Sequence, residues 1–364
     1  MLNIKTITNQ NKWDGYVESF PQVSFLQSWN WGQFIKEKGG DAFYWQFEDN
    51  GDEVGASLVT LQKSSRGNYL ECIGGPLFPT HETSGQIVDD YFNSWLDGVK
   101  KLAHETGAGF LRLRLPVKDT AESREFLDHY NFRETKLYYQ AELTRLVDLN
   151  RTEKELLSEM KKNTRYEMRR AEREGVVIEK ISNIKKQKEK DNAFQTFLDL
   201  YKQMVDRQDF VGYTESYLKK QFDLFNENDQ ASLYIAYFED KPVAASIFFH
   251  YGDTITYHHS ASIPFSKFSA PSLILWEAMK DAKEQGKCWF DLFGIAPPGK
   301  RYESRIGLTK FKEGFGGEEW HWARTHDLIY SMPKYYFSLL IEQIPSGVRE
   351  MGARVVKMVG KFIS

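Results

Sequence analysis

Residues 309–317 read TKFKEGFGG and place a lysine, Lys312, between Phe311 and a glycine-rich turn. A cation held at a fixed position beside an aromatic side chain can stabilise negative charge that develops on a bound ligand. We expected Lys312 at a strand end, with Lys310 on the same strand face, and glycines that let a ligand backbone approach closely. The alternative is a surface lysine beside a core phenylalanine.

A second group of residues that could do chemistry is a basic segment at 161–173. At helical spacing, Lys161, Arg165 and Arg169 fall on one stripe, since they are four residues apart. The guanidinium fork suits phosphate better than an ammonium group does. The segment therefore predicts contact with a phosphate-rich partner, and the alternative is a solvated helix face. Its cations are Lys161, Lys162, Arg165, Arg169, Arg170 and Arg173, opposed only by Glu167 and Glu172.

The histidine and cysteine side chains are weaker candidates for catalysis or metal binding. His258 and His259 are adjacent in a strand-like stretch, so we expected them to point to opposite faces, with at most one lining a cleft. A structural histidine is the alternative. Cys72 and Cys288 are far apart and are expected to be buried thiols. There is no HExxH motif and no cluster of Cys and His, so the sequence predicts no metal site.

The whole chain has the material for packed cores that would position such residues. It has 364 residues, of which 41% are hydrophobic, and a net charge of −3, which excludes a disordered or uniformly basic protein. No apolar run approaches the ~18 residues of a membrane span. We found no signal peptide in MLNIKTITNQ and expected a monomeric protein of the reducing cytoplasm.

An internal repeat indicates the fold. Residues 43–57 and 233–246 share an aromatic-rich strand, an acidic turn and a strand that opens on small residues. In both halves a third strand, a helix stopped by Gly107 or Gly286 and another strand follow. This β-β-β-α-β order predicts an α/β (α+β) protein of two tandem GCN5-related acyltransferase-like domains with mixed, mainly antiparallel sheets.

Acetyl-CoA-dependent domains of that type carry a pyrophosphate loop, Arg/Gln-x-x-Gly-x-Gly/Ala, at the start of a helix. The loop is missing from both halves. The GFGG of 314–317 has Phe311 where the Arg or Gln should stand, and no helix pattern follows it. The sequence therefore predicts acyl transfer from a donor other than coenzyme A.

Four segments resemble signatures of the Fem family of peptidoglycan-bridge aminoacyltransferases, in the same order. They are SFLQSWNWGQFIKEKGG at 24–40, MKKNTRYEMRRAEREGV at 160–176, SAPSLILWEAMKDAKEQGKCWFDLFGI at 269–295 and IGLTKFKEGFGG at 306–317. The resemblance covers about residues 20 to 325. No sustained heptad run is present, so the chain resembles members that lack the coiled-coil arm.

The resemblance implies a reaction and a domain layout. The donor would be an aminoacyl-tRNA used as co-substrate, with no cofactor, and the acceptor an amine on the peptide stem of a nucleotide- or lipid-linked muramyl-peptide precursor. Domain 1 would span 1–150, with the C-terminal segment 325–364 returning to it, and domain 2 would span 151–324. A lipid-linked acceptor would bring the protein to the inner face of the membrane.

The resemblance also implies roles for particular residues. Phe311 and Lys312 match a pair associated with donor binding and catalysis, and the basic segment supplies the tRNA-binding candidates Lys161, Lys162, Arg165, Arg169 and Arg170. Acceptor contacts map onto Lys36, Tyr217 and, more weakly, Tyr257.

Two departures from the family's pattern bear on the acceptor side. Tyr213 stands where some members have an arginine, and Leu115 stands where a proposed basic aspartate would be. These departures predict a different acceptor, such as a lipid-linked precursor. Deprotonation of the amine would then fall to the substrate or to water.

The sequence leaves two alternative functions open, and it leaves two interpretations of the C-terminal segment. The runner-up is a GCN5-type N-acyltransferase that uses acyl-CoA or another acyl donor, and the second alternative is a binding protein without catalysis. The C-terminal SGVREMGARVVKMVGKFIS has an apolar stripe flanked by cations. It predicts either a helix packed on the first domain or a peripheral helix on an anionic membrane.

Overall fold

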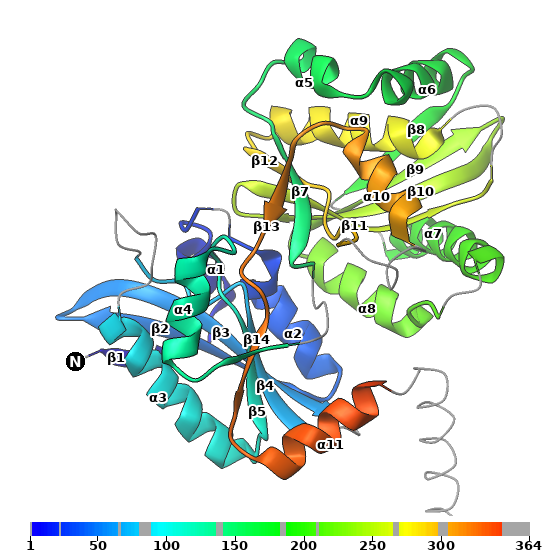
Figure 1. The fold of residues 1–364 in the computed structure, drawn as a ribbon. Coiled ribbons are helices and arrows are strands. Elements are labelled where there is room, and N and C mark those ends of the chain that lie inside the picture. Colours follow the sequence, from blue (N-terminus) through cyan, green and yellow to red (C-terminus); the bar gives the residue numbers. More distant parts are fainter. Residues whose placement is uncertain are drawn as a thin grey trace, which may run out of the picture. The chain divides into compact units, whose positions relative to one another are not determined.

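The computed structural model describes nine stretches of the chain: residues 2–21, 23–64, 67–79, 89–135, 141–182, 187–208, 211–264, 269–297 and 305–343. The chain forms two compact units. Unit 1 comprises 1–13, 31–137 and 323–364, and unit 2 comprises 14–30 and 138–322. Each unit is built on one seven-stranded sheet (Figure 1).

The sheet of unit 1 is antiparallel except for one pair of neighbours, β4 and β5. Its strands, in spatial order, are β1 (Asn3–Thr6), β2 (Asp41–Asp49), β3 (Asp52–Ser64), β4 (Gly67–Ile73), β5 (Phe110–Arg114), β14 (His326–Ile329) and β6 (Arg133–Glu134). The helices of this part are α3 (Asp89–Thr106), α4 (Ala121–His129) and α11 (Met332–Gln343). Helices α1 (Gln10–Val17) and α2 (Trp29–Glu37) each cross the division between the units.

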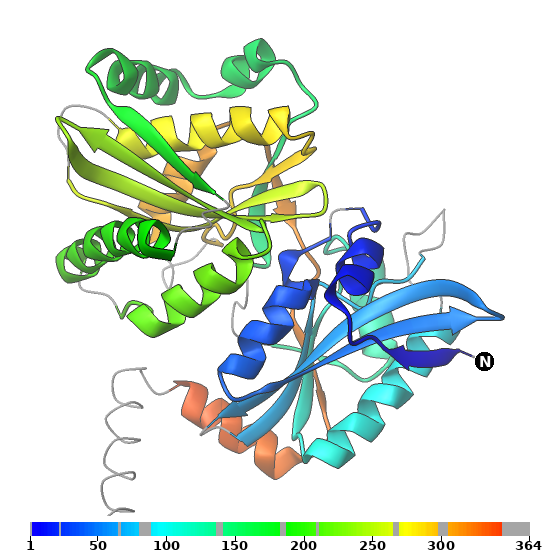
Figure 2. The ribbon, with the colours of Figure 1, turned by 180° about the vertical axis from the view of Figure 1, so that it is seen from behind.

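The sheet of unit 2 follows the same plan, since only β11 and β12 are parallel. The spatial order is β13 (Glu318–His321), β7 (Leu143–Asp148), β12 (Trp289–Asp291), β11 (Thr254–Ser262), β10 (Lys241–Tyr251), β9 (Ala231–Phe238) and β8 (Val177–Ser182). Its helices are the short 3₁₀ helix η1 (Phe25–Gln27), α5 (Glu153–Glu159), α6 (Lys162–Arg173), α7 (Gln187–Gln208), α8 (Glu215–Asn226), α9 (Ala270–Glu284) and α10 (Ile306–Glu313). Helix α9 covers one face of the sheet, and α7 and α8 cover the other (Figures 1 and 2).

The two units repeat one order of elements, which confirms the predicted fold class. Strands β2, β3 and β4, helix α3 and strand β5 correspond to β9, β10, β11, α9 and β12. Gly107 and Gly286 follow the two equivalent helices with positive φ angles of 65° and 74°. A left-handed residue ends a helix at little cost only when it is glycine, which is why this signal could be found in the sequence.

The structure divides the chain before residue 150. Strand β7 (143–148) pairs with β12 and β13, so it belongs to the sheet of unit 2. Residues 14–30 also belong to unit 2, which the sequence did not indicate. Strand β14 lies between β5 and β6 in the sheet of unit 1. The segment 344–364, with its predicted amphipathic helix, lies outside the described residues.

A buried ion pair fastens β14 to unit 1. Arg112 on β5 donates from Nε to Oδ1 of Asp327 at 2.9 Å and from Nη2 to Oδ2 at 3.0 Å. The two side chains are only 1% and 0% exposed, and Tyr335 of α11 donates to the same carboxylate at 3.2 Å. In a low-dielectric interior the charge of either partner is compensated only by the other. The pair therefore fixes where the late strand inserts.

We expect Asp327→Ala to lower the free energy of unfolding by about 3–5 kcal/mol, because it leaves the buried Arg112 guanidinium uncompensated. Urea titration followed by circular dichroism measures the change. The matched control is Asp97→Ala, which breaks the exposed pair with Lys100 and should change stability by less than about 1 kcal/mol. Equal effects of the two substitutions would contradict the role given to Arg112–Asp327.

Candidate active site

The site candidate in unit 2 begins where two parallel strands separate. Strands β11 and β12 pair at three positions only, the last being Thr256 with Asp291. Beyond it β11 continues to Ser262, while the chain after β12 turns toward β7, where Leu292 N donates to Arg145 O at 2.9 Å. Backbone groups at the end of such a ladder are left without a strand partner, so the opening can accept a ligand.

A β-bulge at His258 shapes one side of this opening. Ile247 of β10 pairs with His259, but the next residue, Phe248, pairs with Tyr257, so His258 is the extra residue. The imidazole rings of His258 and His259 lie 4.2 Å apart, centroid to centroid. The expectation that they point to opposite faces is therefore wrong, because a bulge interrupts the alternation of side chains along a strand.

Both imidazoles are held neutral. Burial, together with the nearby His259 and Lys312, holds the pKa of His258 well below its usual range. Burial lowers the pKa of His259 to about 3. His259 donates from Nε2 to Gln221 Oε1 at 2.8 Å, whereas His258 Nδ1 is buried and has no hydrogen-bond partner among the described residues. The His258 ring packs between Phe25, Phe249 and Phe293, at 4.6–5.1 Å between centroids.

A pair of tyrosines extends the site along α8. The rings of Tyr213 and Tyr217 stack at 4.5 Å with an interplanar angle of 9°, and Tyr213 meets His259 edge to face at 5.5 Å. Thr214 caps α8 by accepting from the Tyr217 amide, which fixes where the helix begins. Sequence reasoning treated Tyr213 only as a departure from a pattern. In the structure it joins Tyr217 to the histidines.

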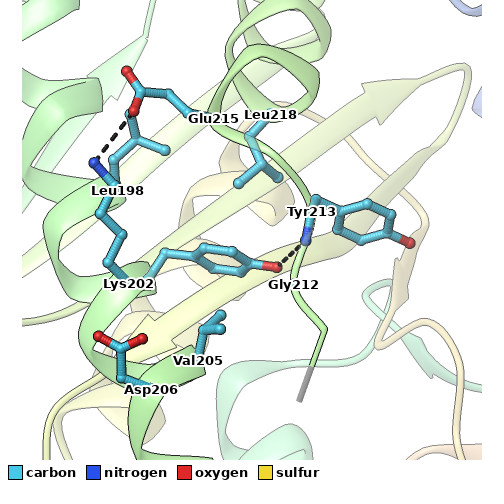
Figure 3. A pocket seen from close by; sticks show the side chains of 9 residues that line it. Leu198, Lys202, Val205, Asp206, Gly212, Tyr213, Glu215 and Leu218 are labelled. Atoms are coloured by element: carbon cyan, nitrogen blue, oxygen red, sulfur yellow. Dashed lines mark hydrogen bonds and ion pairs between the residues drawn. The ribbon is translucent and has the colours of Figure 1, made fainter. Parts of the chain in front are cut away.

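Tyr213 also borders a cavity of about 150 Å³ between α7 and α8. Figure 3 shows side chains that line the cavity. The Tyr201 hydroxyl accepts from the Tyr213 amide at 3.0 Å. Lys202 and Glu215 form an ion pair at its rim. The cavity is lined by Leu198, Tyr201, Lys202, Val205, Asp206, Gly212, Tyr213, Glu215 and Leu218.

Lys312 lies on a helix, α10, and not at a strand end as we expected. The alternation in TKFK is too short to separate a strand from a helix, and in the structure Phe311 instead contacts Phe315 at 5.4 Å. Residues two apart on a helix lie on nearly opposite faces. Lys310 is accordingly exposed, whereas Lys312 is buried at 5% exposure. Phe311 packs against the core of unit 2.

The Lys312 ammonium group lies just past the end of the parallel ladder. Its Nζ donates to the carbonyls of Phe293 at 3.2 Å and Gly294 at 2.7 Å, and it lies 5.8 Å from the ring centroid of Tyr257. Burial lowers the pKa of Lys312 to about 8, against the opposing effect of Asp291. An ammonium group has three N–H donors, so these two carbonyls leave one for a ligand.

Asp291 holds the two carbonyls in place. Its Oδ1 accepts from the Phe293 amide at 2.7 Å and from the Thr144 hydroxyl. Phe293 has φ +58°, a left-handed conformation that costs free energy for a residue with a side chain. Such strain persists only where surrounding contacts fix it. The turn therefore delivers two carbonyl oxygens to Lys312 Nζ in a fixed geometry.

The glycine-rich turn packs against the protein's own chain, which corrects the expectation that it leaves room for a ligand. A Cβ on Gly314 would lie 2.2 Å from Thr164 Oγ1, and one on Gly317 would lie 2.3 Å from Leu146 O. Arg145 of β7 donates to the carbonyls of Gly316 at 2.6 Å and Gly317 at 3.0 Å. The absence of side chains therefore lets α10 approach α6 and β7.

Two cations of the basic segment serve the fold. Lys161 forms an ion pair with Glu313 of α10 at 2.8 Å. Arg165 is partly buried and donates to backbone carbonyls at the end of α5, among them that of Leu157 at 2.9 Å. Lys162 and Arg169 are exposed, and Arg170 lies 3.8 Å from Glu174. The predicted stripe is thus divided between residues that hold α5, α6 and α10 together and residues that face solvent.

One remaining candidate belongs to unit 1, and the cysteines carry no site. Lys36 belongs to unit 1, where its Nζ lies 5.3 Å from the ring centroid of Tyr44. Cys72 is buried and Cys288 is half-buried, both as free thiols. Within the described ranges, no group of three His, Cys, Asp or Glu side chains is placed to hold a metal ion. None of the described helices combines the length and apolar character that a membrane span requires.

Comparisons with known proteins bear on the fold and on the family resemblance. Residues 158–304 match the model of an acetyltransferase (GNAT) domain. The Staphylococcus aureus lipid II:glycine glycyltransferase is 24% identical over 254 residues, which cover 66% of this chain and 56% of that protein. The chain thus spans little more than half the length of this curated relative.

Solved structures show the fold. A crystal structure of FemX superposes with a TM-score of 0.78 at 19% identity and covers 94% of this chain and 100% of that one. A tandem GNAT protein from the clavulanic acid biosynthesis pathway gives a TM-score of 0.52 at 10% identity, covering 90% and 98%. The predicted tandem GCN5-related fold is confirmed, and so is the resemblance to Fem-type aminoacyltransferases.

The glycine turn yields a stability prediction. Gly314→Ala should lower the free energy of unfolding by about 1–3 kcal/mol, because the new methyl group would overlap Thr164 Oγ1. Adding Thr164→Ala should recover part of that loss. The control is Gly307→Ala on the same helix, where a Cβ has no neighbour within 4 Å and alanine should raise stability by up to about 1 kcal/mol.

Thermal and urea unfolding of the four proteins measures these effects. If Gly314→Ala kept full stability and only weakened ligand binding, the turn would serve a ligand after all.

Proposed function

We propose that this relative of the Fem-type enzymes transfers an aminoacyl group from an aminoacyl-tRNA to an amine on the peptide stem of a peptidoglycan precursor. The observation that carries the proposal is the Lys312 ammonium, buried and oriented by two carbonyls at the point where β11 and β12 separate. The name of the curated relative, a lipid II:glycine glycyltransferase, supports the reaction class. The aminoacyl-tRNA is a co-substrate, and no cofactor is part of the proposal.

The reaction needs no redox step. The acceptor nitrogen attacks the ester carbonyl carbon, a C–N bond forms, and the negative charge collects on the carbonyl oxygen. When the intermediate collapses, the ester C–O bond breaks and the ribose hydroxyl leaves with the proton that the amine has lost. The third N–H of Lys312 donates to the oxyanion, and a donor fixed before the reaction needs no reorganisation. Phe311 packs into the core and fixes α10.

The acceptor is a muramyl-peptide precursor, and the lipid-linked form is the one we favour. The relative from Staphylococcus aureus is named a lipid II:glycine glycyltransferase, which points to a lipid-linked acceptor. In unit 2, the stacked rings of Tyr213 and Tyr217 offer faces for a peptide stem. Tyr257, the weaker candidate for an acceptor contact, is only 5% exposed and belongs to the core. Lys36 of unit 1 is exposed and is the candidate contact for the precursor's phosphate groups.

An acyl-CoA-dependent N-acyltransferase is the second candidate, because residues 158–304 match an acetyltransferase domain model. In this chain the helix that follows the splayed strand is α9, and its start is poorly suited to a pyrophosphate. Ser269 already caps the helix by accepting from the Ser272 amide, and proline occupies the first turn and has no N–H. Measurable binding of coenzyme A by calorimetry would favour this candidate.

The first functional prediction concerns Lys312. Lys312→Ala should reduce kcat by about 10²–10³, because one oxyanion donor is lost, in an assay with charged tRNA and muramyl pentapeptide read by mass spectrometry. Lys310→Ala is the matched control, since that side chain is exposed on the opposite face of α10. Its kcat should stay within about twofold of wild type, as expected for a residue outside the site.

The pH dependence provides a second readout. Lys312 is cationic below its pKa of about 8 and neutral above it, so kcat/KM should fall as pH rises through that value. The residual activity of Lys312→Ala should lack this decline. An unchanged kcat in Lys312→Ala, or the same alkaline decline in it, would remove Lys312 from the mechanism.

The second functional prediction concerns the exposed cations of α6. The double variant Lys162→Gln/Arg169→Gln should weaken tRNA binding and reduce the slope of log K against log salt by about one to two units, since each phosphate contact releases counterions. Filter binding at several salt concentrations measures the slope. Lys12→Gln/Lys101→Gln is the control, because it removes the same charge from exposed positions in unit 1.

An unchanged slope in the α6 variant would contradict the prediction and would mean that Lys162 and Arg169 only form a solvated helix face. Substitutions of Lys161 and Arg165 are less informative, because both side chains hold parts of the fold together. A loss of tRNA binding in those variants would be accompanied by a loss of stability.

A further inference from the structure

Helix α11 exposes large apolar side chains on the face that points away from the rest of unit 1. Its inner face presents Tyr335 and Ser338, which are 8% and 1% exposed. Residues four apart share a helix face, so the outer residues form one stripe. These are Met332, Tyr336, Phe337 and Leu340, with exposures of 44%, 59%, 52% and 63%. We call this stripe the α11 outer face.

The inner contacts hold α11 without help from its outer face. The Tyr335 hydroxyl donates to Asp327, and its ring meets Phe110 edge to face at 5.2 Å. Lys334 donates to the Gly107 carbonyl at 2.8 Å. Four large apolar side chains thus remain in water on a helix that is already docked. Contiguous exposed apolar surface of this kind marks an interaction site.

We propose that the α11 outer face docks onto an anionic lipid bilayer. Tyrosine and phenylalanine are side chains that favour the membrane–water interface, where one end of a ring is apolar and the other wet. The chain that continues from α11 is basic: residues 344–364 hold Arg349, Arg354, Lys357 and Lys361 against Glu350 alone. Cations next to an apolar face are attracted to anionic headgroups, at about 1 kcal/mol for each cation near the surface.

Two other occupants fit less well. A stable dimer buries about 800 Å² on each partner, formed by 20–30 residues, whereas the α11 outer face consists of four. The basic segment 344–364 could fold back over α11, but the outer face offers it no acidic partner, since none of its four residues is charged. A bilayer supplies both an apolar phase and negative charge.

The docking surface extends the proposed function, because an acceptor carried on a lipid lies at a membrane. The membrane docking and the proposed transfer reaction can nevertheless be disproved separately. Docking is measured on vesicles without tRNA or acceptor, and transfer is measured on a soluble nucleotide-linked precursor without vesicles.

The experiment is sedimentation of the full-length chain with vesicles of phosphatidylglycerol and phosphatidylcholine, and with vesicles of phosphatidylcholine alone. We expect binding to the anionic vesicles and at least a tenfold lower partition coefficient for Phe337→Ser/Leu340→Ser. The matched control is Val177→Ser, which removes an apolar side chain of similar exposure, 64%, from β8 in unit 2. The control should bind vesicles as the wild type does, and both variants should keep transfer to the soluble precursor.

Three results would overturn the proposal. The wild type binds no anionic vesicles, or the α11 variant binds as well as the wild type. Alternatively, the α11 variant loses vesicle binding together with several degrees of melting temperature, which would mean that the chain itself covers the face. Light scattering tests for a dimer. A molecular mass that falls by half in the α11 variant would identify a second copy as the occupant and would also overturn the proposal.

Discussion

The rest of unit 2 depends on one constraint, the burial of the Lys312 ammonium group. This group lies at the end of the short parallel pairing between β11 and β12. Taking a cation out of water is unfavourable unless acceptors are fixed around it. The carbonyls of Phe293 and Gly294 are those acceptors, and Asp291 fixes them by bonding the Phe293 amide. The lowered pKa of Lys312, about 8, records the balance between burial and this compensation. Near neutral pH the group is therefore still mostly a cation.

The position of α10 follows from contacts that are distant in sequence. Arg145 holds the glycine turn after the helix, and Lys161 pairs with Glu313 at its end. Gly314 and Gly317 allow this close packing because any side chain there would overlap neighbouring atoms. The basic segment and the glycine turn thus both hold α10, the helix that carries Lys312. Lys162 and Arg169 of α6 are exposed and take no part in this packing.

The two units use the same topology for different purposes. In unit 1, β14 lies next to β5 and is fastened by the buried Arg112–Asp327 pair. In unit 2, β7 takes the equivalent place next to β12, and the opening past the ladder is lined by neutral imidazoles and a cation. Charge in unit 1 is therefore neutralised within the fold. In unit 2 a buried cation is held by two backbone carbonyls just past the parallel pair of strands.

The sequence by itself determined the repeat, the fold class and the pairing of Phe311 with Lys312, because strand alternation, helix-ending glycines and short motifs are local signals. The tertiary structure decided what those residues do. It made 306–313 a helix, since a four-residue alternation fits either element and packing of Phe311 on the core settles the choice. It placed His258 and His259 side by side through a bulge that depends on pairing with β10. It also gave Lys161 and Arg165 structural partners. The charge pattern along one helix could not predict these partners, because the carbonyls and the carboxylate belong to other elements.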